Sequence, residues 1–302
     1  MTAALNNHSA TLHELGVRYG TDKVHHNYLV VYDRLFAPLR STARRMLEVG
    51  VFRGASVMMW RDYFARAEIV GMDVFGQASG LDFSTAKMML DRQSAGFYKA
   101  AKRGAYGARV NVTRCNHSDV ASMERFVGAE RAASREYDII VEDGSHLQRD
   151  QQLNLAQLLP LVRAGGYYII EDINTGFQPY YDEPMRGVNT TFGVLQRMRH
   201  SGRFDSKHLS QRQAQYIEQW IEVAVLFAPP ARLYRRHMTC VIRKRLVLPS
   251  EGAGGISSRA NVTLSNVAEQ KLSSALCAHT PSCMNPATGR KGSAQTASRT
   301  FV

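Results

Sequence analysis

Cysteine is scarce in this chain, and long apolar runs are missing. Four cysteines occur among 302 residues, and the nearest pair, Cys277 and Cys283, lacks the CxxC spacing of zinc and redox motifs. No run reaches the roughly 18 apolar residues of a membrane span. The polar stretch 1–16 does not resemble a signal peptide. We therefore expect a cytoplasmic protein with reduced cysteines and no membrane partner.

Basic residues outnumber acidic ones, giving a formal net charge of +12 and a pI near 9.7. An excess of this sign can attract nucleic acid or an anionic surface. Some basic residues do cluster, within 232–236 and 243–245. No RNA-binding signature or basic-aromatic stripe accompanies them, so the sequence favours dispersed surface charge over nucleic-acid binding.

Apolar segments with strand and helix periods alternate along most of the chain. Segment 11–39 has helical spacing, interrupted by a polar turn at 19–26. Strands are predicted at 46–49, 69–74, 110–113, 138–141 and 167–170, and helices at 54–65, 123–131 and 148–162. This alternation predicts a Rossmann-like, doubly wound α/β sheet with helices on both faces. Runs 222–227 and 238–243 have no helix between them and predict an antiparallel edge hairpin.

The composition changes towards both ends of the chain. Residues 249–302 are rich in Ser, Ala, Thr and Gly and poor in aromatics, which predicts a disordered tail. Residues 1–10 are predicted to be disordered as well. One α/β domain is therefore expected over 11–248, and its first part, 11–44, is expected to form an N-terminal helical lid. The lid candidates are Lys23, His25, His26, Tyr28 and Tyr32.

Two of the predicted strands end in acidic residues. Tyr137–His146 reads YDIIVEDGSH, and Gly165–Asp172 reads GGYYIIED. Parallel strands joined by one helix end at the same edge of a sheet, so these polar residues can share one crevice. Carboxylates suit Mg²⁺ or Mn²⁺, and a nearby histidine is a candidate base. The residues concerned are Asp143, His146, Glu171 and Asp172.

The first predicted strand runs into a glycine-containing turn, Glu48-Val-Gly50-Val-Phe-Arg-Gly54. Glycine allows a sharp turn and close approach of a ligand, although the pattern fits G-x-G-x-x-G poorly. Asp73 ends the second strand, where a carboxylate can bind ribose hydroxyls. The loop combines an acidic residue with glycines, and Asp73 stands where a ribose can bind, but the glycine pattern that binds phosphate is missing. This combination suits a nucleoside ligand that has no pyrophosphate group. S-adenosylmethionine is a ligand of that kind.

These motifs, in this order, resemble the class I S-adenosylmethionine-dependent methyltransferases. More narrowly, they resemble the metal-dependent sugar O-methyltransferases of macrolide biosynthesis. The matching stretches include Tyr19-Gly-Thr-Asp-Lys23, Leu47-Glu-Val-Gly50, Ile69-Val-Gly-Met-Asp73, Glu142-Asp-Gly-Ser-His146 and Ile170-Glu-Asp-Ile173. The resemblance covers roughly residues 15–245.

The resemblance implies a seven-stranded sheet whose final strand is antiparallel. It also implies that Asp143, Glu171 and Asp172 bind Mg²⁺ and that His146 is the general base. The implied cofactor contacts are Glu48, Gly50, Gly54, Asp73, Asn116, His117, Ser118 and Asp143. The loop Cys115-Asn-His-Ser-Asp119 departs from the Gly-Asp-Gln-Ser-Asp usual in the family, and segment 76–107 is longer than expected.

Three functions are compatible with these residues. The first is a Mg²⁺-dependent O-methyltransferase acting on a hydroxyl of a sugar or another small molecule. The second is an enzyme of the same fold that methylates a catechol or a carboxylate. The third is a non-catalytic binding protein on this fold. The sequence does not name the acceptor, and a homo-oligomer is compatible with the lid and the edge hairpin.

Overall fold

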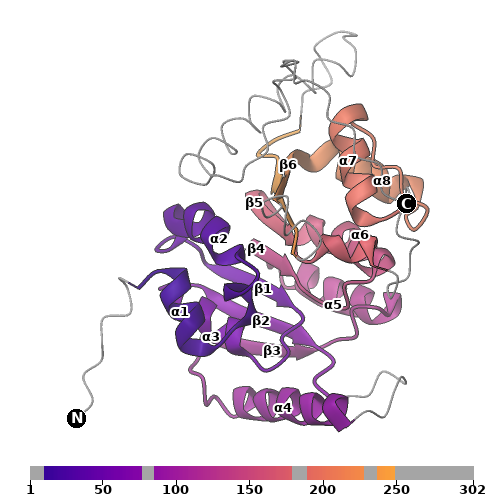
Figure 1. Cartoon of the computed structure of the whole chain (residues 1–302). Coiled ribbons are helices and arrows are strands. Elements are labelled where there is room, and N and C mark those ends of the chain that lie inside the picture. The colour runs from indigo at the N-terminus through magenta and orange to yellow at the C-terminus, as the bar shows by residue number, and fades with distance from the viewer. Residues whose placement is uncertain (1–9, 77–84, 179–188, 228–236, 249–302) are drawn as a thin grey trace, which may run out of the picture.

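The computed structural model describes residues 10–76, 85–178, 189–227 and 237–248, which fold around one seven-stranded sheet (Figure 1). The strand order is β3-β2-β1-β4-β5-β7-β6. Neighbouring strands from β3 to β5 are parallel, and β7 runs antiparallel to both β5 and β6. The predicted doubly wound fold is therefore confirmed. The strands are β1 (Arg45–Val49), β2 (Glu68–Asp73), β3 (Val110–Arg114), β4 (Tyr137–Glu142), β5 (Val162–Ile170), β6 (Ile221–Phe227) and β7 (Thr239–Lys244).

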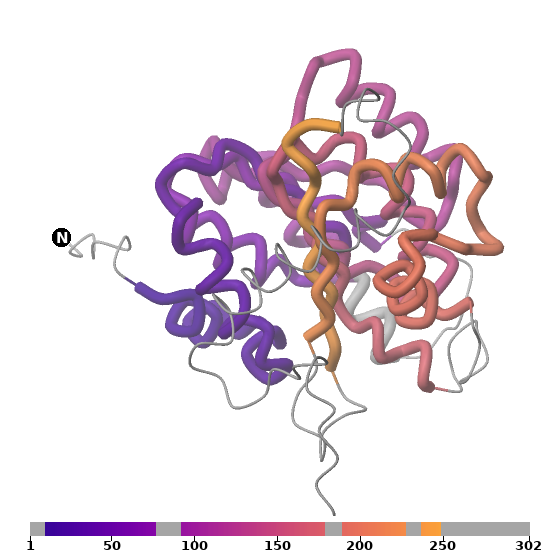
Figure 2. Tube along the Cα trace, turned by 90° about the horizontal axis from the view of Figure 1, so that it is seen from above, coloured from indigo at the N-terminus to yellow at the C-terminus, as the bar shows by residue number. Residues whose placement is uncertain are grey.

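Helices cover both faces of the sheet (Figures 1 and 2). One face packs against α1 (Leu12–Tyr19), α2 (Tyr28–Phe36), α3 (Ala55–Tyr63) and α4 (Thr85–Lys102). The other packs against α5 (Val120–Ala132), α6 (Gln148–Leu158), α7 (Thr191–Ser201) and α8 (Gln211–Trp220). Short 3₁₀ helices lie at η2 (Asp22–Val24), η3 (Ala37–Leu39), η4 (Leu159–Leu161) and η5 (Ile173–Phe177).

Burial on both faces explains why the central strands are continuous apolar runs. All residues of β1 and β4 are buried. Because successive side chains alternate between faces, Leu47 and Ile140 join one core, whereas Met46 and Ile139 join the other. Burying each such side chain stabilises the fold by about 1.5–3 kcal/mol. The carboxyl ends of β1, β2, β4 and β5 are consequently held on a rigid edge.

The N-terminal segment forms two helices separated by a turn, as its helical spacing predicts. Thr11 and Glu14 form a capping box at the start of α1, which ends at Gly20 in the left-handed conformation. The turn that follows contains η2 and leads into α2. This turn places Lys23 and Tyr28 at the sheet edge, where they contact strand-end residues.

Some elements differ from the sequence-based expectation. Helix α4 occupies much of the long segment 76–107, and α7 and α8 lie between β5 and β6, where no helix was predicted. The segments expected to be disordered, apart from Ala10, lie outside the described residues. Across the part of the chain that is described, no helix is sufficiently long and apolar to span a membrane.

Candidate active site

Backbone strain is concentrated at the carboxyl edge of the sheet. Phe52, Phe75, His146 and Asp172 have positive φ angles of 53°, 49°, 60° and 52°, and they follow β1, β2, β4 and β5 respectively. A non-glycine residue in this region costs about 1–3 kcal/mol and persists only where the surroundings hold it. His146 therefore precedes α6 as a strained loop residue and is not part of its first turn.

The glycine loop after β1 packs tightly against the end of β4. Gly50 has φ +86°, and a Cβ there would lie 1.9 Å from the carbonyl oxygen of Asp143. Asp73 fixes the loop, because its Oδ2 accepts hydrogen bonds from the backbone N–H groups of Val51 (2.8 Å) and Phe52 (2.9 Å). The predicted cofactor residues Gly50, Asp73 and Asp143 are thus brought together.

A lysine lies at the centre of the acidic strand ends. The Nζ of Lys23 is 2.5 Å from Asp143 Oδ2, 2.8 Å from Glu171 Oε2 and 3.4 Å from Glu48 Oε1. Lys23, Glu48 and Glu171 are each at most 1% exposed. We refer to Lys23, Glu48 and Glu171, with the Lys23-facing oxygen of Asp143, as the Lys23 cluster. Its ammonium group compensates part of the buried negative charge.

The pKa values in the Lys23 cluster follow from burial and from these contacts. Burial opposes the charged form of Lys23, but Asp143, Glu171 and Glu48 hold its pKa well above the usual value. Burial, reinforced by Asp143, raises the pKa of Glu171 well above its usual value. Burial also raises the pKa of Glu48, against the opposing effect of Lys23.

Two tyrosines of α2 fasten the N-terminal segment to the same strand ends. The Tyr32 hydroxyl donates to Glu171 Oε1 at 2.9 Å, and the Tyr28 hydroxyl donates to Asp172 Oδ1 at 2.7 Å. Both rings are buried. The N-terminal segment therefore contributes the polar side chains of Lys23, Tyr28 and Tyr32 to the site and completes its inner wall.

On the solvent side, His146 lies between two carboxylates. Its Nδ1 is 4.0 Å from Asp143 Oδ1, and its Nε2 is 3.9 Å from Asp172 Oδ2. The side chains of Asp143, His146 and Asp172 are 20%, 26% and 13% exposed, and one donor atom from each lies within 4.8 Å of the others. We call these three residues the His146 cluster. The separations exceed hydrogen-bond lengths and leave the donor atoms available to a cation.

Asp143 and Asp172 each use one oxygen on the inner side and direct the other towards His146. Thr175 supports this arrangement, because its hydroxyl lies 2.8 Å from the backbone carbonyl oxygen of His146 and can donate to it. The third predicted metal ligand, Glu171, lies in the Lys23 cluster and not beside His146. Each of its oxygens keeps a further lone pair beyond the bond to Lys23 or Tyr32.

The predicted cofactor contacts Asn116, His117 and Ser118 lie on the loop after β3. Asn116 is exposed, and its Oδ1 accepts the backbone N–H of Ser118. The Ser118 hydroxyl donates to Asp150, at the start of α6. The His117 ring lies against Gly144, where a Cβ would be 2.6 Å from its Cε1. Of the three, His117 is therefore the one placed directly against the loop that carries Asp143.

Glu142 is a buried carboxylate next to the site, and it is not one of the three carboxylates that Lys23 contacts. It is fully buried, and its Oε1 accepts a hydrogen bond from Asn154 at 3.3 Å. Burial raises its pKa to about 7. The sequence analysis named this residue only as part of the stretch Glu142-Asp-Gly-Ser-His146. Its protonation state is consequently expected to change near neutral pH.

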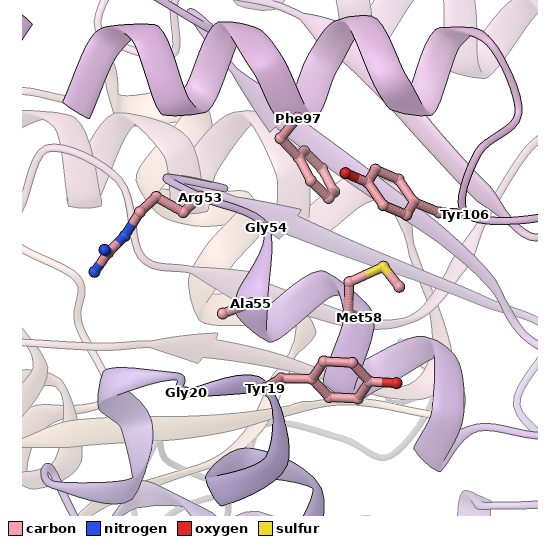
Figure 3. A pocket seen from close by; sticks show the side chains of 8 residues that line it. All are labelled: Tyr19, Gly20, Arg53, Gly54, Ala55, Met58, Phe97 and Tyr106. Atoms are coloured by element: carbon pink, nitrogen blue, oxygen red, sulfur yellow. The ribbon is translucent and has the colours of Figure 1, made fainter. Parts of the chain in front are cut away.

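A separate cavity of about 320 Å³ opens beside the glycine loop (Figure 3). Phe97 and Tyr106 stack on one side with their ring centroids 4.8 Å apart, and Tyr19 lies on the other side. Gly54, the last residue of the predicted cofactor loop, forms part of the lining. No lining residue belongs to the Lys23 or His146 cluster, so this cavity is distinct from the strand-end site.

Sequence reasoning did not find every residue at this edge. It named Lys23 only as a lid candidate, although a Lys in a polar turn before the acidic strands was a usable signal. No sequence pattern points to His237, which precedes β7, because only the tertiary fold brings its Nδ1 to 3.4 Å from Asp172 Oδ1.

Comparisons with known proteins agree with this fold. The family described as Methyltransferase domain matches residues 47–173, which run from within β1 to just past β5 and contain the strand-end acids. Among solved structures, the MycE methyltransferase from the mycinamycin biosynthetic pathway, in complex with Mg and SAH, aligns with a TM-score of 0.57. It is 23% identical, and the alignment covers 83% of this chain and 58% of MycE.

Curated relatives include sugar O-methyltransferases. The L-olivosyl-oleandolide 3-O-methyltransferase of Streptomyces antibioticus is 29% identical over 69% of this chain and 49% of its own length. The mycinamicin VI 2''-O-methyltransferase of Micromonospora griseorubida is 28% identical over 62% of this chain and 43% of its own length. The match thus spans about half the length of these relatives. The predicted resemblance to sugar O-methyltransferases is confirmed.

Proposed function

We propose that this chain is an S-adenosylmethionine-dependent, Mg²⁺-dependent O-methyltransferase that acts on a hydroxyl of a sugar or another small molecule. The observation that carries the proposal is the position of His146 between the carboxylates of Asp143 and Asp172, beside the loop held by Asp73. The methyltransferase-domain match and the names of the sugar-methylating relatives support the reaction type.

The proposed cofactor site surrounds the glycine loop. Gly50 lets the loop approach the end of β4, and Asp73 orders the loop through two backbone N–H groups. Asp73 Oδ1 accepts one backbone N–H, from Phe75, and retains a lone pair that can accept a ribose hydroxyl, whereas the loop uses both lone pairs of Oδ2. The residues proposed to contact S-adenosylmethionine are Glu48, Gly50, Gly54, Asp73, Asn116, His117, Ser118 and Asp143.

The donor set at the strand ends fits a divalent cation of the Mg²⁺ or Mn²⁺ type. Asp143 and Asp172 offer half-buried carboxylate oxygens, and Glu171 retains lone pairs within reach of the same edge. We therefore propose Asp143, Glu171 and Asp172 as the ligands. Such an ion, when bound, lowers the pKa of a coordinated hydroxyl and orients it.

His146 is proposed to accept the proton of the acceptor hydroxyl. Its ring is partly exposed, and the flanking carboxylates stabilise the imidazolium that proton transfer would form. The Thr175 hydroxyl supports the strained His146 backbone and thereby the direction of the ring. Holding the acceptor and the methyl group in line would supply much of the remaining rate acceleration.

A methyl-transfer assay with purified protein and S-adenosylmethionine tests this proposal. Glycosides, catechols and carboxylates are offered in parallel, with and without EDTA. Methylation of glycosides that EDTA abolishes is the expected result. Transfer only to catechols or carboxylates would favour the same-fold alternative. An absence of both cofactor binding and transfer would contradict an enzymatic function and favour a non-catalytic binding protein.

A further inference from the structure

Two imidazoles lie beside Asp172 on the side away from His146. His26 comes from the turn before α2, and His237 comes from the residues just before β7. Their rings stack with centroids 3.7 Å apart and an interplanar angle of 12°. The Nδ1 of His237 is 3.4 Å from Asp172 Oδ1. The fold therefore gathers two histidines and one carboxylate from three separate segments.

The possible metal-binding atoms of these three residues lie close to one another. One donor atom each from His26, Asp172 and His237 lies within 4.8 Å of the other two, and all three side chains are only partly buried. Among the described residues, the buried Nδ1 of His26 has no hydrogen-bond partner. Coordination by both rings requires one of them to turn out of the stack, and the χ2 torsion of histidine is soft enough to permit this.

The donor chemistry selects a different ion from the one at the His146 cluster. Two imidazoles with one carboxylate suit Zn²⁺ and similar first-row metals, whereas Mg²⁺ prefers all-oxygen sites. Asp172 Oδ1 faces the histidine pair, and Asp172 Oδ2 faces His146, so the two sites would share one carboxylate without sharing an oxygen. The Tyr28 hydroxyl, bonded to Oδ1 at 2.7 Å, would orient this ligand from outside.

We propose that His26, Asp172 and His237 form a second metal site, which binds a divalent transition metal such as Zn²⁺. The site is distinct from the Mg²⁺ site of the proposed methyl transfer, and it does not depend on that activity. An ion there would tie the N-terminal segment to β5 and β7 at the same edge.

Cobalt titration of the chelator-stripped full chain tests the proposal directly, because Co²⁺ gives a visible absorption when it replaces Zn²⁺. With excess Mg²⁺ present to fill the proposed Mg²⁺ site, wild type is expected to bind one Co²⁺ with nitrogen coordination. His26→Ala and His237→Ala should each weaken binding at least about tenfold, as losing a metal-site residue does. His25→Ala is the matched control, an exposed neighbouring histidine, and should bind as wild type does.

Further variants distinguish this site from the Mg²⁺ site, and they distinguish a loss of metal binding from a loss of folding. Asp143→Asn should leave Co²⁺ binding unchanged while it impairs the Mg²⁺-dependent reaction. His237→Gln keeps a hydrogen-bonding group beside Asp172 but removes a strong ligand, so it should lose Co²⁺ binding without losing thermal stability. Wild type that fails to bind Co²⁺ would overturn the proposal. Undiminished binding in the folded His26→Ala and His237→Gln variants would overturn it equally.

Discussion

Two charged clusters lie side by side at the carboxyl edge of the sheet, and they share Asp143. The Lys23 cluster is closed, since its carboxylates are buried and bonded to an ammonium group and to tyrosine. The His146 cluster is open, since its side chains are partly exposed and the His146 ring nitrogens stand about 4 Å from the two carboxylates. The chain itself therefore compensates much of the inner charge, whereas the outer oxygens of Asp143 and Asp172, with a remaining lone pair of Glu171, are left for a ligand.

The largest expected effect follows from removing His146, the proposed general base of the His146 cluster. His146→Ala should lower turnover by about 10²- to 10⁴-fold, the usual contribution of a positioned general base. S-adenosylmethionine binding, measured by calorimetry, should persist because the glycine loop does not depend on the imidazole. His25→Ala is the control and should leave both quantities unchanged. Unaltered turnover in His146→Ala would remove the assignment of the base.

Disrupting the Lys23 cluster should lower the stability of the fold. Lys23→Met leaves three acidic groups near one another without their cation, so the free energy of unfolding should fall by about 3–5 kcal/mol at pH 8. The deficit should shrink at pH 5, because burial already raises the pKa values of Glu48 and Glu171 and protons can then replace the lysine charge.

Urea unfolding at both pH values measures this difference. Lys99→Met, at an exposed position on α4, serves as the control and should change stability by less than about 0.5 kcal/mol. A Lys23→Met protein as stable as wild type at pH 8 would show that the buried acids do not need their cation.

The fold and the outer cluster were predictable from sequence, whereas the inner cluster was not. Buried parallel strands ending in Asp143 and Asp172 have a local signature, and topology alone places their ends together. The pairing of Lys23 with Glu171 spans 148 positions and depends on how the turn at η2 crosses the sheet. His237 lies outside every motif, so only the tertiary structure links it to Asp172.

Glu142 contrasts with the acids of the Lys23 cluster, because it is buried but is not one of the carboxylates that Lys23 contacts. Its pKa is raised to about 7, from a usual value of 4.5. The native state therefore binds this proton more tightly than the unfolded chain does, and stability should fall as pH rises from about 4.5 to about 7. Glu142→Gln should remove that loss and add up to about 3 kcal/mol at pH 8. A Glu142→Gln protein whose denaturation midpoint differs from that of wild type by the same amount at pH 5 and at pH 8 would contradict this.

A smaller effect is expected where the N-terminal segment meets the open cluster. Tyr28→Phe removes the hydroxyl bonded to Asp172 Oδ1 and should lower the free energy of unfolding by about 2 kcal/mol. Thermal unfolding measures the loss, and the aromatic packing of the ring is retained in the variant. A stability equal to wild type would show that this hydrogen bond does not hold Asp172.

Calorimetric titration with Mg²⁺ tests the contrast between the clusters most directly. Wild type is compared with Asp172→Asn, which alters the open cluster, and with Glu48→Gln, which makes the same chemical change in the closed one. Asp172→Asn should weaken Mg²⁺ binding at least about tenfold, and Glu48→Gln should bind within a few-fold of wild type. Loss of Mg²⁺ binding in Glu48→Gln, with Asp172→Asn unaffected, would contradict the account.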